Sequence, residues 1–61
     1  MNIIKASDAR QNFQEMIDTV YYKEQPTIIV KRKKPWVIIQ PLSHLDTDTQ
    51  EKIYQEIKKN L

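Results

Sequence analysis

Two short segments, residues 27–31 and 36–40, constrain the fold most, because each is apolar on both of its faces. The apolar positions are Ile28, Ile29 and Val30 in the first segment and Val37, Ile38 and Ile39 in the second. Both segments are rich in β-branched residues and are typical of strands. A sheet with a single helix layer would alternate apolar with polar side chains along each strand. We therefore predict that both faces of this sheet are covered, one of them by a second subunit.

The length of the chain supports the same prediction. A chain of 61 residues buries only about 60% of its unfolded surface, so small domains usually add disulfides, a metal or a partner chain. The sequence has no cysteine, and its one histidine, His44, cannot hold zinc without other ligands clustered nearby. A homodimer is the expected support, and we expect no metal or other cofactor. His44 is expected to be an ordinary surface residue.

No apolar run approaches the roughly 20 residues that cross a bilayer, and no signal-peptide core follows the N-terminus. The chain is therefore expected to be a soluble cytoplasmic protein.

The remaining elements follow from local patterns. Residues 3–5 predict a short strand, and Ser7 is the expected N-cap of one amphipathic helix that follows it. The apolar stripe of this predicted helix consists of Ala9, Phe13, Met16, Ile17 and Val20. Pro26 ends the helical region, and the two strands then form a hairpin. The predicted fold class is α+β, a small β-α-β-β-α domain with an antiparallel sheet and helices.

The turn of the hairpin is unusual because it lacks glycine and asparagine. Tight hairpin turns need left-handed residues. Either Arg32 or Lys33 adopts that conformation, at a cost of roughly 1–2 kcal/mol, or the loop is wider than two residues.

The basic charge lies in the first two thirds of the chain. Residues 1–42 carry seven basic and four acidic side chains, and residues 43–61 carry three basic and four acidic ones. Four consecutive cations occupy positions 31–34. Such a run attracts phosphate without regard to base sequence, although a soluble hairpin tip that resists edge-to-edge aggregation is the alternative.

The C-terminal segment is predicted to be a helix that begins with a capping box at Thr47 and Gln50, with Ser43 as an earlier alternative cap. Ile53, Ile57 and Leu61 recur every four residues, with Tyr54 beside them. Such a narrow stripe suits either a partner's groove or packing on the chain's own dimer. Trp36 is expected to pack in the sheet or the dimer interface, and Tyr21 and Tyr22 to pack at the helix end.

The ordered combination of these elements resembles the Phd/YefM family of antitoxins. The front of the chain, Ile4-Lys5-Ala6-Ser7-Asp8-Ala9-Arg10-Gln11-Asn12-Phe13, matches the helix start of that family at Ser7, Ala9, Arg10, Asn12 and Phe13. A proline before a strand, a basic hairpin and a strand that ends in Pro41-Leu42 continue the likeness to about residue 45. The glycine-free turn and the short C-terminal segment depart from the family's usual pattern.

The resemblance implies a type II antitoxin that is also a dimeric DNA-binding repressor of its own transcription. Residues 1–45 would dimerise and bind a palindromic operator, and residues 46–61 would form a helix that neutralises a toxin, by analogy a RelE-like endoribonuclease. The expected DNA-binding residues are Lys5, Ser7, Arg10, Asn12, Lys31, Arg32, Lys33 and Lys34. The expected toxin-binding residues are Ile53, Tyr54, Ile57 and Leu61.

Two other hypotheses remain open at this point: a stand-alone repressor or orphan antitoxin, and a purely structural interaction module. An enzyme is not expected, because the sequence has no catalytic Ser/His/Asp set, paired buried carboxylates or glycine-rich phosphate loop.

Overall fold

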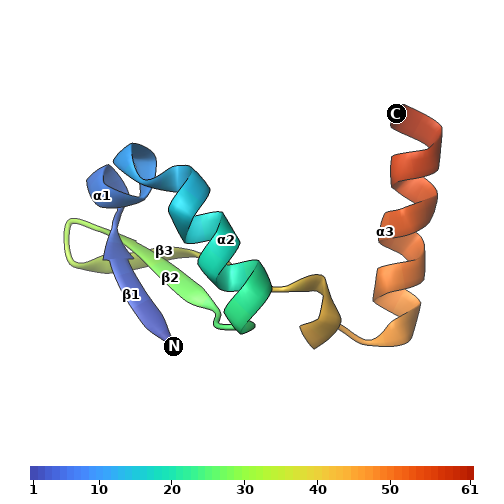
Figure 1. Cartoon of the computed structure of the whole chain (residues 1–61), viewed down its shortest axis with the longest axis horizontal. Coiled ribbons are helices and arrows are strands. Elements are labelled where there is room, and N and C mark those ends of the chain that lie inside the picture. The colour runs from blue at the N-terminus through green and yellow to red at the C-terminus, as the bar shows by residue number, and fades with distance from the viewer.

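The computed structural model describes all 61 residues and shows a three-stranded sheet with helices on one side (Figure 1). The elements are β1 (Asn2–Lys5), α1 (Ala6–Gln11), α2 (Phe13–Lys23), β2 (Thr27–Lys31), β3 (Lys34–Ile39), a 3₁₀ turn (Leu42–His44) and α3 (Thr47–Asn60). The predicted α+β class and the order of strands and helices agree with this arrangement.

The sheet is mixed, so the predicted antiparallel sheet is wrong for one of its two pairings. Its strand order is β1-β2-β3, with β1 parallel to β2 and β2 antiparallel to β3. Parallel strands need a long crossover connection, which is usually helical, and α1 and α2 supply it here. Only the hairpin between β2 and β3 is a local pairing that sequence can indicate.

The predicted single helix is interrupted at Asn12. This residue has φ −120° and ψ 37°, and both its backbone N–H (3.0 Å) and its side-chain Nδ2 (3.3 Å) donate to the Asp8 carbonyl oxygen. The helical period survives the break, because Ala9, Met16 and Val20 are buried. Phe13 departs from the predicted stripe and is 57% exposed.

Ser7 is not the cap that we expected, because α1 begins one residue earlier, at Ala6. Lys5 precedes the helix with extended backbone and makes no side-chain capping bond. At its other end α2 stops at Glu24, which takes a left-handed conformation (φ 52°) two residues before Pro26.

The hairpin turn resolves the alternatives that the sequence left open. Arg32 (φ 52°) and Lys33 (φ 65°) are both left-handed, which is the pattern of a two-residue type I′ turn. β3 consequently begins at Lys34, two residues before the predicted start. A bulge follows, because Ile29 pairs with Val37 while Val30 pairs with Pro35, so Trp36 has no partner in β2.

The core lies between the helices and one face of the sheet. Ala9, Met16 and Ile29 form its buried centre, with Ile4, Ala6, Ile17 and Ile39 packed around them. Only six residues of the chain are buried, so a single chain gains little stability from burial.

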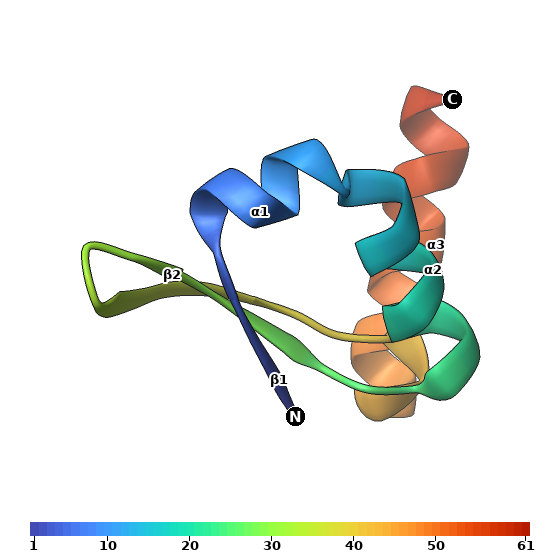
Figure 2. The ribbon, with the colours of Figure 1, turned by 60° about the vertical axis from the view of Figure 1, so that its left-hand side comes forward.

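The other face of the sheet has no helix over it, as Figure 2 shows. The register places Ile3, Ile28 and Ile38 side by side across the three strands on this face. Ile3 and Ile38 are exposed, and Trp36 beside them is 61% exposed. We call Ile3, Ile28, Trp36 and Ile38 the outer sheet face. Trp36 is thus not packed within its own chain, and its predicted place in a dimer interface stays a prediction.

α3 stands apart from the sheet and its helices (Figure 1). Its cap is Asp46, whose carboxylate Oδ1 accepts from the Thr49 backbone N–H at 2.7 Å. The predicted capping box at Thr47 and the alternative cap at Ser43 are therefore both wrong. Gln50, the expected second member of the box, donates its side-chain N–H to the Leu45 carbonyl oxygen instead, at 2.8 Å.

Candidate functional site

Five of the eight predicted DNA-binding residues line one hollow where β1 leads into α1 beside the hairpin tip. They are Lys5, Ser7, Lys31, Arg32 and Lys33. The parallel register explains why distant residues meet: Lys5 lies opposite Val30, directly before the turn. We call this group the basic hollow. Its four cations are exposed and, with no acidic residue lining it, it favours a polyanion.

The left-handed turn brings the hairpin cations close together. Lys31 and Lys34 are directly opposed across the two strands, and like charges in that position repel each other. Lys34 is exposed but does not line the basic hollow. A bound phosphate would reduce this repulsion, since each phosphate carries the opposite charge.

Lys31 also contacts the outer sheet face. Its Nζ lies 4.8 Å from the centre of the Trp36 ring, within the range of a cation–π interaction. Sequence reasoning missed this contact. The two-residue turn makes Lys31 and Trp36 diagonal neighbours across the hairpin, so the contact becomes visible only once the register is known.

Arg10 does not line the basic hollow. It is an exposed residue in the last turn of α1. Ser7, three residues earlier, lines the hollow, and residues three apart share one side of a helix. Arg10 therefore extends the polar surface that begins at Ser7.

Asn12 is placed elsewhere, in a separate hollow lined by Ile4, Met16 and Thr27 among others. Its amide group is occupied by the bond to the Asp8 carbonyl at the helix break. The structure thus gives Asn12 a role in shaping the chain and does not bring it to the basic hollow.

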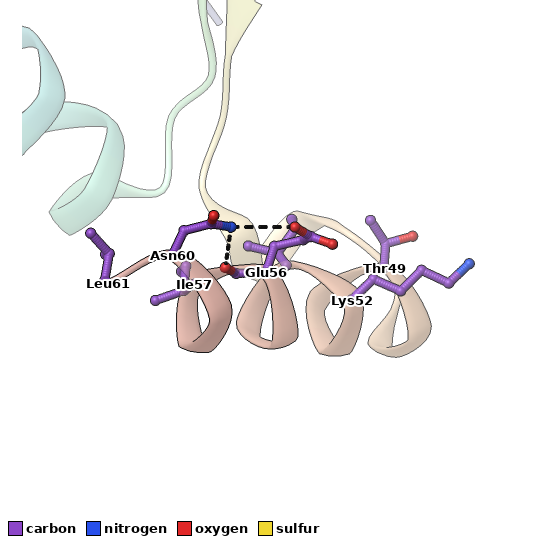
Figure 3. Close-up of a pocket in the computed structure, with 7 residues that line it drawn as sticks. Thr49, Lys52, Glu56, Ile57, Asn60 and Leu61 are labelled. Carbon is purple, nitrogen blue, oxygen red and sulfur yellow. Dashed lines mark hydrogen bonds between the residues drawn. The ribbon is translucent and has the colours of Figure 1, made fainter.

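The predicted toxin-binding residues of α3 divide between two surfaces. Ile53, Ile57 and Leu61 lie on one face with Thr49, Lys52, Glu56 and Asn60, and Figure 3 shows the labelled members of this set projecting from one side of the helix. The Asn60 side chain donates to the Glu56 carbonyl oxygen at 2.8 Å and so closes the last turn. Tyr54 instead lines a hollow with Tyr21, Tyr22 and Leu42.

Tyr21 and Tyr22 do not pack at the helix end as we expected. They are 68% and 78% exposed. Their rings contact each other edge to face, with centroids 4.9 Å apart. The burial of Val20 in the core turns the two following side chains outward, since consecutive helical residues point in different directions.

The carboxyl of Asp46, which caps α3, has a lowered pKa. The hydrogen bond from the Thr49 backbone N–H, and then that from the Thr49 side chain, lower the pKa of the Asp46 carboxyl below its ordinary value. A charged carboxylate at the start of α3 is also favoured by the helix dipole.

The helices and the sheet contain no grouping of three or more His, Cys, Asp or Glu side chains that could hold a metal ion. None of the helices is both long enough and apolar enough to cross a membrane.

The structure is a small α+β domain with a basic hollow at one end and a detached amphipathic helix at the other (Figure 1). A family model described as antitoxin Phd_YefM, type II toxin–antitoxin system, matches residues 1–56. The chain therefore belongs to the Phd/YefM family of type II antitoxins. Comparison with curated proteins and with solved structures gives no match.

Proposed function

We propose that this antitoxin is a dimeric repressor that binds operator DNA through its basic hollow and neutralises a toxin through α3. The observation that carries the DNA-binding half is the meeting of Lys5, from β1, with Lys31, Arg32 and Lys33, from the hairpin, in one hollow. Residues 1–45 form the dimerising, DNA-binding part of the chain, and residues 46–61 form the toxin-binding part. Neither part has a catalytic role.

The contacts with DNA are of two kinds. The lysines and Arg32 attract phosphates and supply affinity that falls with salt. Arg10 is the candidate for reading a base edge, because a guanidinium group suits both guanine and phosphate. Ser7 is a neutral donor on the same side of α1 and suits a phosphate oxygen.

Dimerisation uses the outer sheet face. Its exposed side chains, Ile3, Trp36 and Ile38, are the apolar surface that a second copy would cover, and the burial within one chain is small. A two-fold axis would repeat the basic hollow and Arg10 on both subunits. The matching target is a palindromic operator.

The toxin-binding half rests on α3 and on the family, since a type II antitoxin implies a toxin partner. α3 has an apolar face and stands clear of its own domain (Figure 1). An amphipathic helix of this kind lies in a hydrophobic groove of its partner. By analogy with the family we propose that the partner is a RelE-like endoribonuclease and that the pair acts in the cytoplasm.

The repressor role is tested with the DNA that lies upstream of the chain's own reading frame. Fluorescence anisotropy compares a labelled duplex of this DNA with a scrambled duplex of equal length over a series of salt concentrations. We expect tighter binding to the upstream duplex and a linear decrease of log K with log salt concentration. Equal binding to both duplexes would exclude sequence-specific repression.

A further inference from the structure

The end of α2 presents two aromatic side chains that nothing in the chain covers. Tyr21 and Tyr22 are the two residues that precede Lys23, the last residue of this helix. Their side chains are 68% and 78% exposed. Tyrosine is enriched at protein interfaces, because it combines a large apolar ring with a hydroxyl group. Two adjacent exposed tyrosines therefore indicate a contact surface.

This surface is continuous with α3. Tyr21 and Tyr22 line a hollow of about 500 Å³ together with Leu42 and, from α3, Tyr54. We call these four residues the tyrosine surface. Tyr54 lies one turn before Ile57, so this hollow adjoins the face of α3 that carries Ile53, Ile57 and Leu61. An apolar strip thus runs from α2 across the hollow and along α3.

The connection between the two helices has defined geometry. The Ser43 hydroxyl donates to the Glu24 carboxylate at 2.9 Å and joins the end of α2 to the 3₁₀ turn. The turn itself is closed by bonds from the His44 and Leu45 backbone N–H groups to Pro41 and Leu42, both at 3.0 Å. The tyrosine surface is therefore assembled from segments held in place within the chain.

We propose that the toxin contacts the tyrosine surface as well as α3, so that the toxin-binding site begins at the end of α2. This inference rests on the proposed toxin-binding function. The apolar face of α3 has only Ile53, Ile57 and Leu61 as its hydrophobic members. A specific interface buries about 800 Å² on each partner, and a buried tyrosine contributes roughly 150–250 Å². Tyr21 and Tyr22 supply area that α3 lacks.

A second copy of the chain has a separate place. The outer sheet face lies on the side of the sheet away from α1 and α2 (Figure 2), whereas Tyr21 and Tyr22 belong to α2. In the proposed function the toxin engages α3, and Tyr54 of α3 lines the hollow together with Tyr21 and Tyr22. Continuity with α3 therefore favours the toxin as the occupant.

The direct test replaces both tyrosines, as Tyr21→Ser with Tyr22→Ser, in the full chain. The probe is the purified protein encoded by the adjacent reading frame, and calorimetry measures its Kd. Phe13→Ser is the matched control, because Phe13 is a 57% exposed aromatic residue at the opposite end of α2. We expect the double variant to bind roughly tenfold more weakly or worse, and the control to bind as the wild type does.

Each outcome of this titration decides between the proposals. A wild-type chain that does not bind the probe overturns the toxin-binding function and this inference together. Wild-type binding with an unchanged Kd in the double variant overturns this inference alone and leaves α3 as the whole site.

Two further measurements exclude a structural effect of the substitutions. Light scattering should give the same dimer mass for the double variant and the wild type; a monomeric variant would assign Tyr21 and Tyr22 to the dimer interface and overturn the proposal. Nitration of the wild-type chain should modify both tyrosines when it is free and neither in the complex with the probe. Equal nitration in both states would contradict toxin contact.

Discussion

Arg10 extends into solvent from the last turn of α1, three residues after Ser7 of the basic hollow. Its replacement by alanine removes a guanidinium group that no acidic side chain in the fold engages, so folding should be unaffected. We expect Arg10→Ala to weaken binding to the upstream duplex by roughly five- to 150-fold, since a base-reading arginine contributes about 1–3 kcal/mol. Anisotropy measures the Kd, and light scattering checks that the dimer mass is unchanged.

Arg10→Lys is the control for this prediction. Lysine keeps the positive charge but lacks the planar guanidinium group. If Arg10 reads a base, Arg10→Lys should keep the affinity that does not depend on base sequence and lose the preference for the upstream duplex. Unchanged operator binding by Arg10→Ala would remove Arg10 from the site.

Arg32 and Lys33 carry the conformational cost of the turn. Each is left-handed, which costs roughly 1–2 kcal/mol for a residue with a Cβ. Arg32→Asn with Lys33→Gly supplies the residues that a type I′ turn favours. We expect urea denaturation to show a gain of about 2 kcal/mol in the free energy of unfolding, and anisotropy to show weaker DNA binding.

Arg32→Gln with Lys33→Gln separates charge from conformation, because it removes both cations and keeps both left-handed side chains. It should weaken DNA binding to a similar degree without the gain in stability. If Arg32→Asn with Lys33→Gly has a lower free energy of unfolding than the wild type, the strain assigned to the turn is contradicted.

At the scale of elements, the start of α3 depends on one carboxylate. The hydrogen bonds from Thr49 lower the pKa of Asp46, so the folded helix favours the charged form more than the unfolded chain does. The stabilisation is complete above the ordinary aspartate pKa of about 3.9 and is lost as the pH falls through the lower value of the folded state. We expect the helicity of α3, measured by Cα chemical shifts, to decrease over that acidic range.

Asp46→Ala should show reduced α3 helicity already at neutral pH, because it removes the capping acceptor. Asp48→Ala is the matched control, since Asp48 lies in the first turn but does not accept the capping bond. Equal helicity in Asp46→Ala and the wild type would show that α3 begins without this cap.

Local sequence patterns predicted most of the helices and strands. The features that the sequence did not predict depend on contacts between distant segments or on a local break in a helix. The β-branched segments predicted β2 and β3, and the four-residue spacing of Ile53, Ile57 and Leu61 predicted α3. The parallel pairing of β1 was missed because it joins Asn2 to Thr27 across two helices. The helix break at Asn12 was missed because the apolar period continues through it to Met16 and Val20.

The same distinction applies to the candidate site. The cationic run at positions 31–34 was visible in the sequence, but its meeting with Lys5 follows from the parallel register. Asn12, although it matches the family motif, is turned to a different hollow by the break that it creates. The exposure of Tyr21 and Tyr22 has no local signal, because it depends on where Val20 enters the core.

At the scale of the whole molecule, the outer sheet face should hold two copies together. Ile3→Glu with Ile38→Glu places carboxylates at exposed positions of this face, where a single chain tolerates them. A dimer would bury these charges without partners, which costs several kcal/mol. We expect light scattering to show a monomer and anisotropy to show weak operator binding, since one subunit reaches only one half-site.

Phe13→Glu, an exposed apolar position in α2 away from this face, should leave the dimer intact. A dimer of full mass in the Ile3 and Ile38 double variant would place the subunit interface elsewhere.

We propose that the chain combines DNA recognition at one end with toxin neutralisation at the other, and growth rescue tests the toxin-neutralising role of α3 most directly. The protein encoded by the adjacent reading frame is induced in cells together with the full chain, with the chain lacking residues 50–61, or with Arg10→Ala. We expect the full chain and Arg10→Ala to restore growth and the truncated chain to fail, although it still binds the upstream duplex. Full rescue by the truncated chain, or no rescue by the full chain, would contradict an antitoxin that acts through α3.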